Sequence, residues 1–450
     1  MRTPRLFGVG LLLLILSSTA GAQQREAGAL APQELARIWD VEHVSPPLPP
    51  LMDHRELVRR VESLVGGSSG LFDVEKAGES VEGRAIYHVS VGKGPYPVLL
   101  WSQMHGDEPT ATAALFDVFE YLRRRQNEPA VQRLLSALTL HVIPMLNPDG
   151  AERFQRRNAQ GIDVNRDALR LQTPEGRILK GVRDRWRPAV GFNLHNQNWR
   201  TSVGDPPKPA SMSLLSVAFD PARSDSEGRQ LTRKLCAVIR DAVEPFAPGQ
   251  IGRYDDEFEV RAFGDNVTLW GTPVVLIETG GWPSAQPDST LVRLNFIAIL
   301  SALDSLASKR VEGADPQRYE SLPMNEARVF YIIVRNATVI NGAGIPPFVA
   351  DIGVIANRRV RQTAGSRDLQ MSLIVEDIGD LRTSGGFTTI DATGMTIVPA
   401  ADDLEAGRLV DLPEWKSRNA VSIAVGEPAR FALLKPASEA GKYVVVAAIK

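Results

Sequence analysis

The chain has 450 residues, of which 43% are hydrophobic and 23% are charged, and its formal net charge is −2. These values are typical of a soluble globular protein, and they give no indication of binding to nucleic acid or to an anionic membrane. The length exceeds that of one ordinary domain and predicts two. The single cysteine, Cys236, excludes an intramolecular disulfide.

The N-terminus has the pattern of a secretory signal. Two arginines precede an apolar run at residues 6–16, which is short for a membrane span, and small residues follow at 20–22. We therefore expect a signal peptide at residues 1–22 and a secreted or periplasmic, bacterial protein; an uncleaved anchor is the alternative. Residues 23–50, polar and then rich in proline, are expected to form an extended lead-in.

Strand-like and helix-like segments alternate from residue 51 to residue 308. This alternation predicts an α/β domain around a largely parallel sheet, in which functional sites form at the carboxyl ends of strands. No stretch after the signal is expected to match a membrane helix in length and composition. The expected strands are residues 72–76, 84–91, 96–101, 138–146, 189–194 and 272–277, and the expected helices are 51–65, 110–125, 228–243 and 290–307.

The composition changes near residue 310, where helical periodicity stops. Residues 309–327 are the expected linker, and residues 328–450 contain short β-rich runs separated by Gly, Asn, Asp and Pro. This pattern predicts an all-β sandwich. The expected strands are residues 329–334, 337–340, 369–375, 388–391, 420–424, 430–434 and 443–449.

Two of the six histidines, His105 and His195, stand at the ends of apolar runs among polar or small residues. Glu108 follows His105 by three residues, on what reads as a tight turn before a helix. Two histidines and one carboxylate are a recognised set of ligands for catalytic zinc. Spacing alone is a weak indication, and structural roles for these residues stay open.

Glu278 follows a buried apolar run directly. Burying a carboxylate is costly unless it has a partner or a task, so Glu278 is either part of a cap or ion pair, or a general base beside a metal. The loop at residues 156–167 contains three arginines among Gly, Asn and Asp. It is either a solvated turn or a clamp for a substrate carboxylate, which arginine binds with two parallel hydrogen bonds.

Five segments follow one another along the chain: Gly78-Glu79-Ser80 with Glu82-Gly83-Arg84, His105-Gly106-Asp107-Glu108, Asn147-Pro148-Asp149-Gly150, Arg156-x-Asn158 through residues 161–166, and His195 followed by Ile277-Glu278-Thr279-Gly280. In this order they resemble motifs of the zinc carboxypeptidase family, the carboxypeptidase A-like metallopeptidases. The resemblance covers residues 51–308 and implies a three-layer α/β/α sandwich around a mixed, mostly parallel sheet.

The same resemblance implies roles for individual side chains. Where the family often reads Asn-Arg-Asn, this chain has Asn165-Arg166-Asp167, and Tyr254 lies near the position of the tyrosine that closes over the substrate. The acidic residues Asp255, Asp256, Glu257 and Glu259 favour either a basic substrate side chain or simply a solvated loop. The implied residues are His105, Glu108 and His195 for one zinc ion per chain, Glu278 as general base, Arg156 for the oxyanion, and Asn165, Arg166 and Tyr254 for the substrate.

The C-terminal part has its own resemblance. Residues 333–342, 389–394 and 422–431 look like the small β-sandwich that accompanies amidohydrolase barrels, but the barrel and its metal motif are absent from the sequence. This implies an accessory domain without a catalytic centre.

The leading interpretation is therefore a secreted zinc metallocarboxypeptidase, with a peptide or acyl-amino-acid substrate that carries a free carboxylate. The alternatives are a zinc amidase of cell-wall peptides or N-acyl amino acids, and a binding protein without catalytic activity.

Overall fold

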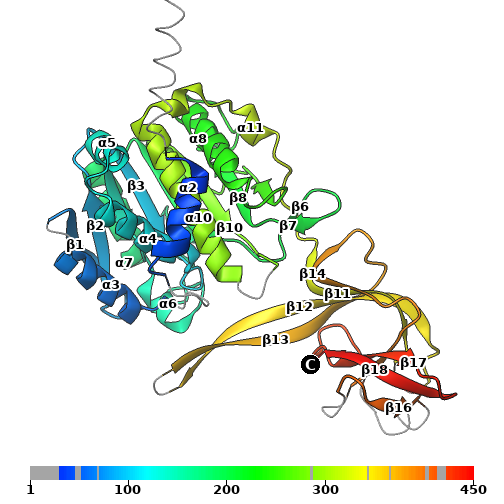
Figure 1. Cartoon of the computed structure of the whole chain (residues 1–450). Helices are drawn as coiled ribbons and strands as arrows, with labels where there is room; N and C mark the ends of the chain where they lie inside the picture. The colour runs from blue at the N-terminus through cyan, green and yellow to red at the C-terminus, as the bar shows by residue number, and fades with distance from the viewer. Residues whose placement is uncertain are drawn as a thin grey trace, which may run out of the picture.

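The computed structural model (Figure 1) describes residues 30–45, 52–67, 70–283, 287–341, 344–363, 366–400, 405–412 and 422–449. The expected signal peptide lies outside these residues. The described chain contains two large β-sheets, one among helices and one in the C-terminal part.

The first sheet has eight strands in the order β1-β2-β4-β3-β5-β10-β8-β9. Its centre is parallel, because β3 pairs in parallel with β4 and β5, and β5 pairs in parallel with β10. The pairs β1–β2, β2–β4 and β10–β8 are antiparallel, which confirms a mixed sheet. The strands are β1 (Phe72–Glu79), β2 (Ala85–Val91), β3 (Tyr96–Ser102), β4 (Leu138–Ile143), β5 (Val190–Asn196), β8 (Met212–Ser216), β9 (Ile251–Arg253) and β10 (Val274–Thr279).

Helices cover both faces of this sheet. Along β3 the side chains alternate: Val98 and Leu100 pack in one apolar cluster, and Leu99 and Trp101 pack in the other. This confirms the predicted three layers. The first cluster includes α2 (Pro32–Glu42), α3 (His54–Gly67), α4 (Thr110–Arg124), α5 (Pro129–Ala137), α8 (Glu227–Val243) and α10 (Pro287–Ala307), and the second includes α7 (Pro174–Trp186) and α9 (Phe263–Leu269).

Helix α2 corrects the expectation of an extended lead-in at residues 23–50. Pro32 occupies its first turn, where a proline is tolerated, and Leu35 and Trp39 are buried against the rest of the first cluster. The helix packs on α10 and α4. The segment is mostly polar, so the helical spacing of its three buried apolar residues, Leu35, Ala36 and Trp39, was not recognised in the sequence.

Asp117 of α4 holds this N-terminal segment in place. Its carboxylate accepts hydrogen bonds from Trp39 Nε1 at 2.8 Å, Val44 N at 2.8 Å, Ser45 N at 2.9 Å and Ser45 Oγ at 2.7 Å. Asp117→Ala leaves these buried donors without an acceptor, so we expect the free energy of unfolding to fall by about 2–4 kcal/mol. Urea denaturation measures this loss. Asp40→Ala, which breaks the exposed ion pair with Arg293, is the control and should cost less than about 1 kcal/mol.

Helix α10 corrects a second expectation. By length and composition, Asp288–Ala307 is apolar enough to cross a membrane, although no such stretch was expected. In the structure 78% of the apolar 18-residue stretch of this helix is buried inside the protein. The helix packs on α2, α4, α5 and α8. The apolar composition is therefore explained by its place in the core, where it faces helices on several sides.

The second sheet confirms the predicted all-β region. Its order is β13-β12-β11-β15-β17-β18-β16, and β14 pairs with β11. On β15, Ile397 and Val398 belong to different apolar clusters, so the sheet buries side chains on both faces. The strands are β11 (Val329–Val339), β12 (Phe348–Thr363), β13 (Ser366–Gly379), β14 (Gly385–Asp391), β15 (Thr396–Pro399), β16 (Leu409–Asp411), β17 (Phe431–Pro436) and β18 (Lys442–Ile449).

Three of the strands expected in this region differ from the strands in the structure. The runs at 329–334 and 337–340 form one strand, β11, whose register shifts between Val334 and Ala337. The run at 420–424 is not a strand over residues 422–424, and its first part lies outside the described residues.

The expected linker is partly folded onto the first domain. It contains a 3₁₀ turn, η2 (Arg310–Gly313), and a short helix, α11 (Gln317–Glu320), which packs on α8. Tyr319 of α11 is buried, and its hydroxyl accepts a hydrogen bond from Ser216 N at 3.1 Å. The boundaries of the two domains stay predictions.

Candidate metal centre and active site

Three neighbouring strands, β3, β5 and β10, bring the predicted site residues to one edge of the sheet. His105 and Glu108 lie in the turn between β3 and α4, His195 lies near the end of β5, and Glu278 lies near the end of β10. In the parallel pairing Glu278 is opposite His195, and Ser102 is opposite Leu194. The carboxyl ends of these strands therefore meet where the sequence predicts a site.

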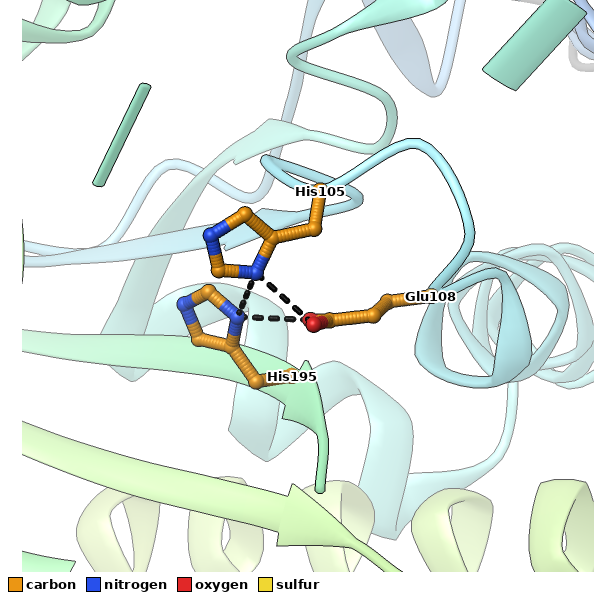
Figure 2. A group of neighbouring side chains, drawn as sticks. All are labelled: His105, Glu108 and His195. Atoms are coloured by element: carbon orange, nitrogen blue, oxygen red, sulfur yellow. Dashed lines mark hydrogen bonds and ion pairs between the residues drawn. The ribbon is translucent and has the colours of Figure 1, made fainter. Parts of the chain in front are cut away.

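Figure 2 shows that His105, Glu108 and His195 point toward one another. Glu108 Oε1 lies 2.7 Å from His105 Nδ1, Glu108 Oε2 lies 2.7 Å from His195 Nδ1, and the two Nδ1 atoms are 3.1 Å apart. The three residues are 2%, 6% and 2% exposed, respectively. One ligand atom of each lies within 4.8 Å of the others, so the group can hold a metal ion.

Two glycines explain why the turn can place both ligands on one side. A Cβ on Gly106 would lie 1.9 Å from the carbonyl carbon of Gly150, so the two backbones touch. Asn147 fixes this approach: its Oδ1 accepts from Gly150 N at 2.9 Å, and its Nδ2 donates to Met104 O at 3.2 Å. The motifs around residues 105 and 147 therefore pack directly against each other, and this contact fixes the turn that carries His105 and Glu108.

Gly106→Ala is expected to displace the turn and lower metal affinity by about 10–100-fold, the range seen when the support of a metal ligand is lost. Competition with a chelator measures the affinity. Gly181→Ala is the matched control, because a Cβ on Gly181 of α7 meets nothing within 4 Å. Metal affinity of Gly106→Ala equal to that of the control would contradict the close contact.

Asp163 is a site residue to which the sequence analysis gave no role. Its Oδ1 lies 3.0 Å from His105 Nε2, and its Oδ2 accepts from Arg156 Nε at 3.0 Å. A carboxylate on the outer nitrogen of a metal-binding histidine fixes the orientation of the ring. Asp163 lies inside the motif at residues 161–166. Its partner could not be read from that motif, because His105 stands 58 residues earlier in the chain.

The charges of this group depend on one another. Burial alone would lower the pKa of His105, but Glu108 and Asp163 outweigh it and raise this pKa to about 9. Burial lowers the pKa of His195, against the effect of Glu108. Burial would raise the pKa of Glu108, yet the two histidines hold it well below its usual range. Glu108 is therefore a carboxylate, the form that binds a metal cation.

Arg156 lies directly beside the ligand group. Its Nη1 is 3.1 Å from His105 Nδ1 and 3.4 Å from Glu108 Oε1, while its Nε is held by Asp163. The side chain is 44% exposed, so the guanidinium lies between the ligands and solvent. It is placed to donate to an oxygen atom that binds next to the ligands.

Glu278 is buried, and its Oε2 has no hydrogen-bond partner among the described residues. Burial, and after it the charge of Glu108, raise the pKa of Glu278 well above its usual range. A carboxyl group with a raised pKa, facing the same cavity as the ligands, is suited to exchange a proton with a molecule bound there.

A cavity of about 640 Å³ opens next to the ligand group. Asn165 and Arg166 line it, and Asn165 Oδ1 accepts from Phe263 N at 2.8 Å. Arg166 Nε lies 3.3 Å from Glu259 Oε2, so its charge is partly paired. Tyr254 also lines the cavity, and burial raises its pKa to about 12, so it stays protonated. The structure thus brings every predicted substrate residue to the same cavity.

Two hydrogen-bond acceptors line this cavity. Asn193 is buried, and its Oδ1 has no partner among the described residues. Asp265 accepts from Glu259 N at 2.9 Å through Oδ1, and burial raises its pKa to about 7. The same lining contains the apolar residues Leu215, Val217 and Leu276.

Residues 58–240 match the family described as zinc carboxypeptidase. The chain is 30% identical over 143 residues to probable carboxypeptidase 2 of Arthroderma benhamiae, covering 31% of this chain and 26% of that protein. It is 30% identical over 254 residues to mouse carboxypeptidase D, covering 45% of this chain and 18% of that protein. A metallo-carboxypeptidase structure from Burkholderia cenocepacia is similar with a TM-score of 0.44 and 17% identity, covering 56% of this chain and 69% of that one.

The matched segment contains His105, Glu108 and His195, and it ends before Tyr254 and Glu278. Glu278 is tied to the segment by its pairing with β5, which carries His195. The chain spans only 26% of the first curated relative, so the likeness concerns this part of the protein.

Proposed function

Because residues 58–240 match the zinc carboxypeptidase family, we propose that the chain is a zinc-dependent carboxypeptidase that removes the C-terminal residue of a peptide. The observation that carries this proposal is the buried His105–Glu108–His195 group, which lies one strand from Glu278 and faces the cavity that contains Arg166. Secretion, proposed from the N-terminal signal pattern alone, would place the enzyme among extracellular or periplasmic peptides.

The ligand group fits zinc, which binds two imidazoles and a carboxylate in catalytic sites. When bound, zinc lowers the pKa of a water and polarises a carbonyl. Glu278 would take the proton of the attacking water and return it to the nitrogen of the leaving amino acid. Arg156 would donate to the oxygen that gains negative charge. Asn165 and Arg166 would hold the terminal carboxylate, and Tyr254 would cover the leaving residue.

Metal analysis tests the cofactor. We expect one zinc ion per chain in the purified protein, loss of activity when a chelator removes it, and recovery when zinc is added back. The His195→Ala protein should contain less than a tenth of the wild-type zinc, because only two of the three metal ligands remain. Full activity after complete removal of zinc would contradict the proposal.

We further propose that the leaving residue carries a cationic side chain. Asn193 Oδ1 has no donor among the described residues, Asp265 adds a carboxyl group to the same cavity, and the apolar side chains of Leu215, Val217 and Leu276 suit the stem of lysine or arginine. The acidic loop contributes less than its composition suggests, because Asp256 pairs with Arg223 and Arg229, away from this wall.

The pH dependence of this preference follows from Asp265. Because burial raises its pKa to about 7, the carboxyl is neutral below this pH and attracts a cation above it. We expect the ratio of kcat/KM for C-terminal lysine over leucine to rise about 10-fold from pH 6 to pH 8. In Asp265→Asn the ratio should be lower and flat. A rise that persists in this variant would exclude Asp265 as its source.

A further inference from the structure

The hairpin of β12 and β13 is the longest paired element of the second sheet. Its register runs from Asp351 opposite Gly379 to Thr363 opposite Ser366. Figure 1 shows the hairpin leaving the second sheet and extending back beneath the helices of the first domain. Along this course Arg359 and Arg361 are exposed, and Met371 is 50% exposed. A two-stranded ribbon that is open to solvent is only marginally stable alone, so its contacts with the first domain fix its position.

Among the described residues, two arginines of the hairpin make such contacts. Arg367 of β13 donates through Nη2 to Ala151 O and Glu152 O, each at 2.9 Å, and its Nη1 lies 3.2 Å from Asp53 Oδ2. The side chains of Arg367 and Asp53 are only 12% and 15% exposed. Arg358 of β12 lies 3.3 Å from Asp288 at the start of α10.

The carbonyls that Arg367 binds end a short helix, α6 (Pro148–Arg153). The last carbonyls of a helix lack partners within the helix, and a cation placed there also interacts favourably with the helix dipole. The chain leaves α6 through Phe154, which has a φ of 49°, and reaches Arg156 two residues later. Asn147, just before the helix, donates to Arg156 O at 3.4 Å. The position of α6 therefore determines where the backbone of Arg156 lies.

We propose that the β12–β13 hairpin is a brace for the active site, in which Arg367 positions Arg156 by capping α6. This inference rests on the proposed function, because it takes Arg156 to act on the substrate. It gives the second sheet a task in the reaction of the first domain although the sheet contributes no ligand from its described residues. Arg367 is a positioning residue, since it acts through the helix and touches no reacting atom.

Arg367→Ala tests the brace in the full-length, zinc-loaded protein. We expect kcat to fall about 10-fold, while KM and zinc content stay near the wild-type values, because the metal and the carboxylate clamp are untouched. Hydrogen exchange followed by mass spectrometry should show faster exchange of the amides in residues 148–157. Arg367→Lys keeps a cationic donor and should recover most of the lost kcat. Arg358→Ala, on the same hairpin but away from α6, is the matched control and should change kcat and the exchange of residues 148–157 much less than Arg367→Ala does.

Unchanged exchange of residues 148–157 in Arg367→Ala would overturn the brace, and so would an equal effect of Arg358→Ala. A loss of kcat accompanied by a matching loss of zinc would also overturn it, because it would show that the metal site itself, and not the position of Arg156, had changed. If the wild type released no C-terminal residue, the proposed function would fail, whereas the exchange experiment would still decide whether Arg367 holds α6.

Discussion

Glu278→Gln is expected to lower kcat for release of a C-terminal residue by about 10²–10⁴-fold, the usual contribution of general acid–base catalysis. Glutamine has nearly the same shape but cannot take a proton from water. Because Glu278 Oε2 bonds to no described residue and burial holds its pKa high, the substitution removes the proton acceptor and leaves the surrounding contacts in place. Steady-state kinetics with parallel zinc analysis measure the loss.

Two features of the result distinguish a base from a structural residue. KM and zinc content should stay within about threefold of wild type, since Glu278 belongs neither to the ligand group nor to the carboxylate clamp. Glu227→Gln, at the exposed start of α8, is the control for the chemical change itself. A kcat of Glu278→Gln near that of the control would assign the proton transfer to another group.

Arg156→Ala is expected to lower kcat by about 10²–10³-fold, as the loss of an oxyanion donor does in other hydrolases. Its guanidinium is held by Asp163 and lies beside His105 and Glu108, where charge would develop on the substrate oxygen. Arg156→Lys should recover little, because one ammonium group cannot keep both the bond to Asp163 and a donor toward the substrate.

Arg157→Ala is the matched control for Arg156. This neighbouring arginine is exposed and donates to Gly161 O at 3.1 Å, within its own loop. It should keep kcat within about threefold of wild type. Equal losses in the two variants would show that the positive charge of the loop, rather than the placement of Arg156, supports the reaction.

The parts of this protein that local sequence determines were predictable. The apolar runs that become β3, β5 and β10 are short, bounded and alternate with helical periods, so they predict a sheet and the edge at which a site forms. His105, Glu108, His195 and Glu278 stand directly at the ends of these runs. Their convergence therefore follows from the parallel pairing of neighbouring strands.

The parts that depend on distant contacts were not predictable in the same way. Nothing local to Asp163 indicates its bond to His105, and nothing local to Gly150 indicates the approach of Gly106. Strand β12 was missed over residues 348–363 because its apolar residues do not alternate regularly with polar ones, and because residues 358–361 carry exposed arginines. Helix α2 was missed because it has few apolar residues, and only their contacts with α4 and α10 show that they form a buried helical face.

The most direct test of the account is mass spectrometry of a matched pair of peptides, one with a free C-terminal carboxylate and one with a C-terminal amide, after incubation with the zinc-loaded protein. The account predicts stepwise loss of single residues from the free peptide, with lysine or arginine removed fastest. It also predicts little cleavage of the amide, which cannot form an ion pair with Arg166. Glu278→Gln should cleave the free peptide at least about 100-fold more slowly than the wild type. Equal cleavage of both peptides, or internal cleavage, would contradict the assignment of a carboxypeptidase.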